Sequence, residues 1–112
     1  MMRLLQGLSG GLALLWMVPS LAETLTLPGE FWISPRSGQS VRAEPQLQQV
    51  FAAYLQSERV RLRLHHQKRD ESTAQAEELR GWLIALGVEA ERIELADDNP
   101  LNLIQIEMMG IR

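Results

Sequence analysis

Cysteine is absent from this chain of 112 residues, and its absence excludes several kinds of site. A disulfide framework is impossible, no thiolate can bind zinc, and no cysteine can accept a lipid. An excess of positive charge is also missing, because 14 acidic residues outnumber 11 lysines and arginines. That balance argues against nucleic acid as the main partner. The length leaves room for one domain with one small core.

Long hydrophobic runs are scarce, and the one candidate begins after Arg3. Residues 12–18 are apolar, and Ser20 and Ala22 are the small residues that signal peptidase recognises. We therefore predict a signal peptide over residues 1–22, cleaved before Glu23, and a periplasmic domain without further membrane contact. The alternative is an uncleaved anchor over residues 4–22. Four residues in that stretch disfavour an anchor: Gly7, Gly10, Gly11 and Pro19.

The clearest pattern predicts a strand at residues 60–65, a helix at 72–86 and a second strand at 92–95. The first segment alternates apolar with basic side chains, which is the period of a half-buried strand. The second segment has one apolar stripe at helical spacing. A strand, a helix and a strand in this order predict a right-handed crossover with parallel pairing.

Both ends of the predicted helix have a local signal. Ser72 and Gln75 stand at the spacing of a capping box, so we expect Ser72 to cap the first turn. Gly87 follows the last apolar residue, where a left-handed conformation is needed, and Val88 can pack back on Leu83.

The flanking segments complete the predicted fold. Residues 23–27 and 30–34 are strand candidates, and residues 34–40 predict a loop. Residues 45–57 form an amphipathic helix that begins with a proline, and residues 101–108 predict the last strand.

The predicted order is therefore β-α-β-α-β-β. We expect an α+β fold, a two-layer α/β sandwich with both helices on one face of a mixed sheet. Residues 23–44 supply N-terminal strands and a loop, and residues 45–112 supply the core of the same single domain.

Residues 45–108 resemble the OmpA-like periplasmic domains that bind peptidoglycan. The best match is Gly87-Val-Glu-Ala-Glu-Arg-Ile-Glu-Leu95, similar to the family's G-V-x-x-x-R-I after its second helix. Leu62-Arg-Leu-His65 stands where the family has a strand ending in G-H-T-D. Ser72-Thr-Ala-Gln-Ala76 stands where it has L-S-x-x-R-A.

The resemblance implies a peptidoglycan site near the start of the second helix. In the family, an aspartate and an arginine hold the diaminopimelate group, and Gln67 and Gln75 occupy those positions here. His65 matches the family histidine, and Arg69 and Asp70 lie near enough to replace the lost charges. A neutral glutamine offers only an ordinary hydrogen bond where the family has a charge-assisted contact.

A second candidate surface is basic. The same face of the predicted strand has three arginines and a histidine: Arg59, Arg61, Arg63 and His65. This face is either a contact for an anionic polymer or acidic partner, or a solvated face neutralised by Glu94 and Glu107 on neighbouring strands. Trp32 is either an exposed contact beside these arginines or covered by residues 23–27.

Neither catalysis nor a metal or other cofactor is expected. His65 and His66 are neighbours on a strand and point to opposite faces, so they cannot chelate one ion. No serine stands in a Gly-x-Ser-x-Gly turn, and no pattern encloses a pair of carboxylates. We therefore predict that the chain is not an enzyme.

Two functions fit these patterns. The first is a non-catalytic exported domain of the cell envelope that acts as a protein-interaction or assembly component. The alternative is a peptidoglycan-binding module that anchors a complex to the cell wall. The neutral side chains of Gln67 and Gln75 favour the first.

Overall fold

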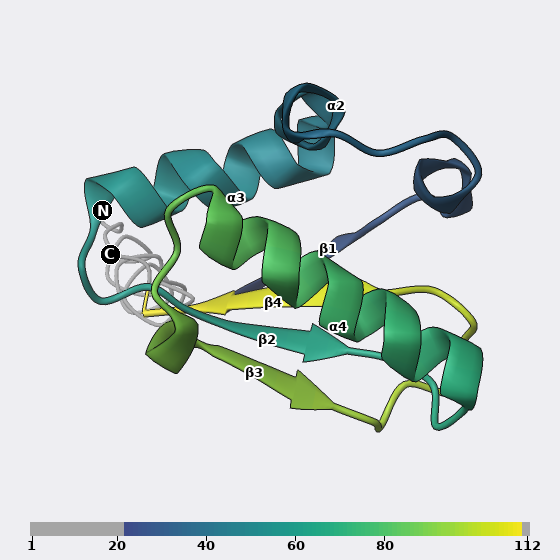
Figure 1. The fold of residues 1–112 in the computed structure, drawn as a ribbon. Coiled ribbons are helices and arrows are strands. Elements are labelled where there is room, and N and C mark those ends of the chain that lie inside the picture. The colour runs from purple at the N-terminus through teal and green to yellow at the C-terminus, as the bar shows by residue number, and fades with distance from the viewer. Residues whose placement is uncertain (1–21, 111–112) are drawn as a thin grey trace, which may run out of the picture.

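The computed structural model describes residues 22–110, which form one sheet with helices on one side of it (Figure 1). The predicted signal peptide lies outside these residues except for Ala22, where strand β1 (Ala22–Thr26) begins. Within the described range, no helix is both long and apolar enough to cross a membrane.

The sheet contains four strands in the order β1-β4-β2-β3. The inner strands are β4 (Gln105–Met109) and β2 (Arg61–His65), which are antiparallel. The edge strand β3 (Ile93–Ala96) is parallel to β2, and the other edge strand, β1, is antiparallel to β4. The sheet is mixed, as predicted.

Helices α3 (Pro45–Gln56) and α4 (Asp70–Ala85) cover one face of this sheet (Figure 1). The short helix α2 (Gly38–Ala43) precedes α3, and the order β-α-α-β-α-β-β therefore has one helix more than we predicted. The 3-10 helix η2 (Ala90–Arg92) leads into β3. The predicted fold class, with helices on one face of a mixed sheet, is confirmed.

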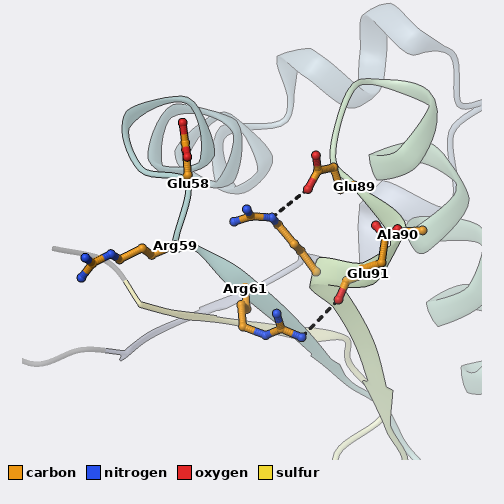
Figure 2. Close-up of a pocket in the computed structure, with 7 residues that line it drawn as sticks. Glu58, Arg59, Arg61, Glu89, Ala90 and Glu91 are labelled. Carbon is orange, nitrogen blue, oxygen red and sulfur yellow. Dashed lines mark hydrogen bonds and ion pairs between the residues drawn. The ribbon is translucent and has the colours of Figure 1, made fainter.

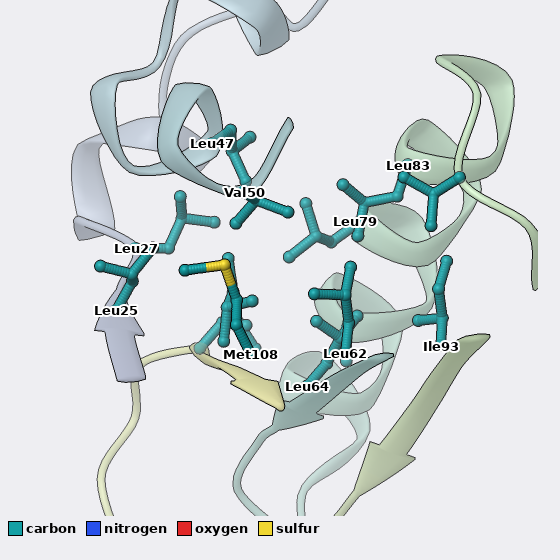
Figure 3. Close-up of a cluster of buried hydrophobic side chains, with 14 of the residues drawn as sticks. Leu25, Leu27, Leu47, Val50, Leu62, Leu64, Leu79, Leu83, Ile93 and Met108 are labelled. Atoms are coloured by element: carbon teal, nitrogen blue, oxygen red, sulfur yellow. The ribbon is translucent and has the colours of Figure 1, made fainter. Parts of the chain in front are cut away.

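The core lies between the two layers, as Figure 3 shows. Leu62 and Leu64 of β2 are 1% and 0% exposed, and they point toward the buried Leu79 and Leu83 of α4. The helix and strand periods therefore place their apolar side chains on facing surfaces, which is the pattern that stabilises a two-layer fold. Further buried members from α3, the other strands and the residues next to them include Leu25, Leu27, Leu47, Val50, Ile93, Ile104, Ile106 and Met108.

The end of α4 agrees with its sequence signal. Gly87 has a φ of 116°, and its N–H donates to the carbonyl of Ile84 over 3.1 Å. The N–H of Val88 donates to the carbonyl of Leu83 over 2.9 Å. These two bonds form a Schellman motif, which satisfies the last carbonyls of the helix and turns the chain toward β3.

The predicted start of α4 is wrong. The helix begins at Asp70, and its N-cap residue, Arg69, makes no side-chain capping bond. Ser72 lies inside the first turn, where it is buried, and its hydroxyl donates to Oδ1 of Asn102 over 3.1 Å. The side chain that sequence spacing assigned to a cap instead attaches the β3–β4 loop to the helix.

Two further predictions, for residues 30–34 and 34–40, are also corrected. Residues 30–34 are not a strand, because the 3-10 helix η1 (Gly29–Trp32) follows Pro28. In this helix the N–H of Phe31 donates to the carbonyl of Pro28. Within residues 34–40 the predicted loop gives way to α2. Ser37 caps this helix, because its Oγ accepts the N–H of Ser40 and Ser40 Oγ accepts the N–H of Ser37.

The last strand is shorter than predicted, because residues 101–104 precede it in a loop held by Asn99. The buried Asn99 side chain donates to the carbonyl of Leu103 over 2.8 Å and accepts the N–H of Leu101 over 3.0 Å. A buried amide that satisfies two backbone groups stabilises a turn at the expense of strand pairing.

We predict opposite effects for alanine at two glycines of α4 and its end. A Cβ at Gly81 or at Gly87 would meet no atom within 4 Å, so backbone conformation alone decides the outcome. Gly81→Ala should raise the free energy of unfolding by about 0.5–1 kcal/mol, because alanine favours a helix interior. Gly87→Ala should lower it by about 1–2 kcal/mol, because alanine disfavours a positive φ. Urea unfolding measures both, and equal signs would contradict the assigned helix end.

Candidate functional site

His65 binds two carboxylates on the open face of the sheet. Its Nδ1 lies 2.7 Å from Oδ1 of Asp98, and its Nε2 lies 2.8 Å from Oε1 of Glu107. A carboxylate accepts hydrogen bonds, so both contacts are satisfied only when both ring nitrogens bear a proton. The arrangement therefore favours the imidazolium form of His65.

The pKa values of His65 and Asp98 shift in the directions that this arrangement requires. Partial burial lowers the pKa of His65, but the hydrogen bonds to Asp98 and Glu107 and their negative charges outweigh it, and the pKa is raised above its ordinary value of 6.5. The hydrogen bond from His65 also lowers the pKa of Asp98. The two shifts describe one interaction from its two sides.

Arg63, on the same face, is neutralised by two carboxylates within the sheet. Arg63 Nε lies 2.8 Å from Oε2 of Glu94, and Arg63 Nη1 lies 4.0 Å from Oε1 of Glu107. Both glutamates lie directly opposite Arg63 on the neighbouring strands. The solvated, internally paired reading of this face is therefore the one that the contacts favour over a free cationic contact.

Arg59 and Arg61 border a hollow of about 620 Å³ at the other end of β2 (Figure 2). Arg61 Nη2 donates to the carbonyl of Glu91 over 3.1 Å, whereas the side chain of Arg59 points away from that residue. Three acidic and three basic side chains line this hollow: Glu58, Arg59, Arg61, Glu89, Glu91 and Arg92. Their charges cancel, so the hollow has no preference for an anionic ligand.

The loop between β2 and α4 makes contacts within the protein. Gln67 Nε2 donates to the carbonyl of Pro100 over 2.9 Å, and Gln67 Oε1 accepts from Arg69 Nη1 over 3.3 Å. Asp70 is exposed as the first residue of α4. Gln67 and Arg69 lie on this loop and Asp70 begins the helix that follows it, whereas His65 is on the open face of the sheet, opposite the helices.

Gln75 instead lies beside Trp32, a residue predicted to share a surface with the arginines of β2. Both line a hollow of about 290 Å³ together with Glu71 and Asn102, and none of those arginines lines it. The Trp32 ring is half-buried and packs edge-on against Phe31, with the ring centroids 4.9 Å apart. The structure thus divides the predicted interaction surface between two ends of the domain.

An apolar groove that the sequence analysis missed lies between α3 and the end of α4. It has a volume of about 510 Å³, and only one of its lining residues, Arg42, is charged. Leu55 projects from it with 84% of its surface exposed. The other lining residues are Gln48, Phe51, Ala52, Tyr54, Leu86, Gly87 and Val88.

The walls of this groove, which we call the α3 groove, are fixed by the fold. Tyr54 accepts the N–H of Glu89 at its hydroxyl over 3.1 Å, and the guanidinium of Arg92 lies 5.9 Å from the centre of its ring. The opposite wall is the Schellman turn after Leu86. A binding surface on two rigid elements loses little conformational entropy when it is occupied.

The sequence contains the apolar residues of the groove, but their spacing does not distinguish them from the core residues of α3. Helical periodicity groups the apolar residues of α3 into one stripe, from Leu47 to Leu55. Because a helix turns about 100° per residue, Leu55 lies about 80° around the helix from Leu47. Leu47 is buried and Leu55 is exposed, so the wide stripe is in fact a core face and a second, free face.

The described residues contain no group of three histidine, aspartate or glutamate side chains that could hold a metal ion. His66, next to His65, is 4% exposed, and its Nδ1 lies 2.9 Å from the carbonyl oxygen of Gln67. The two histidines therefore have separate surroundings.

Comparisons with protein-family models, with curated proteins and with solved structures gave no match. The resemblance to OmpA-like domains therefore stays a prediction from short motifs.

We predict that the His65 contacts stabilise the fold most at weakly acidic pH. Because the folded pKa of His65 is raised, its contribution is complete below the unfolded value near 6.5 and is lost as the pH rises through the folded pKa. The lowered pKa of Asp98 gives a contribution that is present above its unfolded pKa and lost as the pH falls. Urea unfolding of the wild type and His65→Gln should therefore differ more at about pH 5.5 than at about pH 8.5.

Asp98→Asn provides the matched variant, because it leaves the ring in place and removes one charge that favours its protonation. In the Asp98→Asn background, the stability that His65 contributes should differ less between these two pH values. A gap between wild type and His65→Gln that grows toward high pH would contradict the prediction.

Proposed function

We propose that this chain is a non-catalytic, exported domain of the cell envelope that acts by binding another protein, and that the α3 groove is the binding surface. The observation behind the proposal is an exposed apolar face on a rigid helix. Leu55 leaves 84% of its surface in solvent, beside the partly buried Phe51. Apolar surface gathered in one hollow and left in water marks a site for association.

The remaining charged surfaces support this choice. Arg63 and His65 already have carboxylate partners, and Arg61 borders the hollow of Figure 2, where acidic and basic side chains are equal in number. A partner that bound there would have to replace paired groups, with little net gain. The α3 groove has no such competing contacts, so its burial contributes the full apolar term.

Export rests on the predicted signal peptide at residues 1–22, and the absence of cysteine agrees with a fold that needs no oxidising step. The two envelope functions share this location. They differ in the surface that they use and in the chemistry of the partner.

The alternative, peptidoglycan binding, has one favourable observation. Gln75, at the position of the family's arginine, lines the hollow beside Trp32, and within the described residues its amide makes no hydrogen bond. An open amide beside an aromatic ring can contact a sugar or a peptide. This hollow, however, contains neither His65 nor Gln67, the other residues to which the resemblance assigns the ligand.

We predict a site-specific contact of the α3 groove in cells that express the full chain. A benzophenone side chain at Ala52 should form a light-dependent adduct of one defined mass, because Ala52 lies on the exposed floor of the groove. Leu55→Glu in the same chain should abolish the adduct, because a carboxylate cannot enter an apolar contact without loss of hydration.

Ile33→Glu is the matched control, since Ile33 is 81% exposed and lies near the start of α4, far from the groove. Both substitutions should leave the free energy of unfolding within about 0.5 kcal/mol of the wild type. The adduct must survive Ile33→Glu. If it survives Leu55→Glu as well, or never forms, the proposed function is wrong.

We further predict that the purified chain does not sediment with insoluble peptidoglycan at about 0.15 M salt, where attraction between exposed charges is screened. Sedimentation that persists there and is lost in Gln75→Ala, but not in Leu55→Glu, would establish the alternative function instead. Arg69→Ala serves as a second test of the loop, because its guanidinium contacts only Gln67 and Glu71 among the described residues.

A further inference from the structure

The free face of α3 has the spacing of a helix-packing surface. Gln48 and Phe51, and likewise Ala52 and Leu55, are three residues apart, whereas Gln48 and Ala52, and Phe51 and Leu55, are four apart; all four line the α3 groove. Residues at this spacing form a ridge along one side of a helix. The ridge spans two turns, about 10 Å.

Small residues in the groove permit another element to approach closely. Ala52 lies next to Phe51 and three residues before Leu55 on α3, and Gly87 lies on the facing wall. A Cβ at Gly87 would meet nothing within 4 Å, so open space lies in front of the wall. Helices pack 8–10 Å apart, at roughly the lower limit where small side chains lie in the contact.

An extended strand is a poor occupant, because the groove offers no free row of backbone groups. The backbone of α3 bonds within the helix, and the N–H groups of Gly87 and Val88 already donate to Ile84 and Leu83. Strand addition depends on unpaired backbone groups at a sheet edge. A helix needs none, since its own backbone is internally bonded.

Charge determines what lies at the end of the groove. Arg42, in the last turn of α2, is exposed. Its side chain makes no ion pair and no hydrogen bond within the part of the chain that the structure describes. It is the sole charged residue lining the α3 groove. A carboxylate on the occupant would pair with it, and a lysine there would be repelled.

We infer that the occupant of the α3 groove is an amphipathic helix of a partner protein, with apolar side chains at positions i, i+3 or i+4, and i+7, and an acidic side chain that meets Arg42. This inference rests on the proposed function and specifies its partner. The apolar row fills the space beside Phe51 and Leu55. The acidic residue fixes the direction in which the helix lies along α3.

A random 16-residue peptide display library, selected on the immobilised purified chain, tests the inference. The enriched peptides should show the apolar spacing with an aspartate or glutamate at one end. Their affinity should fall by about tenfold or more on Leu55→Glu, which removes the apolar contact, and should be unchanged on Ile33→Glu. Enrichment of peptides without helical spacing, or no enrichment, would overturn the inference.

Arg42→Glu provides the sharper variant, because it reverses the one charge in the groove and leaves every apolar contact. Peptides selected on wild type should lose about fivefold in affinity, and a repeated selection on Arg42→Glu should enrich lysine or arginine at the same position. Unchanged acidic preference would contradict the role of Arg42.

The oligomeric state of the purified chain tests whether a second copy of the chain occupies the groove in place of a partner helix. A dimer that disappears on Leu55→Glu would mean that a second copy fills the groove, and the inferred partner helix would be wrong. The Ala52 cross-link tests the proposed function independently. An adduct with another protein but no helical peptides would leave that function standing and remove only this inference.

Discussion

The packing of α4 against the central strand β2 is the contact on which the rest of the structure depends. Leu62 and Leu64 meet Leu79 and Leu83, and all four are removed from water. Because β2 has a neighbour on each side, this contact also fixes the sheet. It determines where both ends of α4 lie. The first turn of α4 faces the hollow with Trp32, and the Schellman turn after the helix forms a wall of the α3 groove.

This arrangement explains why one helix has two kinds of apolar face. The buried face of α3, with Leu47 and Val50, closes the core above β4 and β1. Its neighbouring face, with the partly buried Phe51 and the exposed Leu55, lines the α3 groove. Two helices cannot cover every apolar side chain of a small domain, since the surface of a short chain is large relative to its volume. The uncovered part is available to a partner.

Features set by neighbouring residues were predictable from the sequence, and features set by distant ones were not. Gly87 ends α4 because its own backbone and that of Val88 supply the bonds. The spacing of Ser72 predicted a cap, but its hydroxyl donates to Asn102, thirty positions away. Alternating Phe31 and Ile33 suggested a strand, yet Phe31 packs on the core from a 3-10 turn while Ile33 is 81% exposed.

The candidate sites follow the same division. Neutralisation of Arg63 was predictable, since the strand register places Glu94 and Glu107 opposite it. The meeting of Trp32 with Gln75 depends on how η1 returns toward α4, which no local pattern contains. Leu55 was assigned to the stripe of α3 because helical periodicity does not specify how much of a wide stripe a neighbour covers.

The strand order has a consequence for how the protein is assembled during synthesis. Gln105–Met109 is the last of the four described strands along the chain, yet it lies between β1 and β2, and among the described residues it is the only strand bonded to β1. Until β4 has been synthesised, β1 has no hydrogen-bonding partner among these strands, and one side of β2 is unpaired. The sheet is therefore completed by insertion of β4 between two strands that were made earlier. The nascent chain must avoid pairing with other chains until β4 is available.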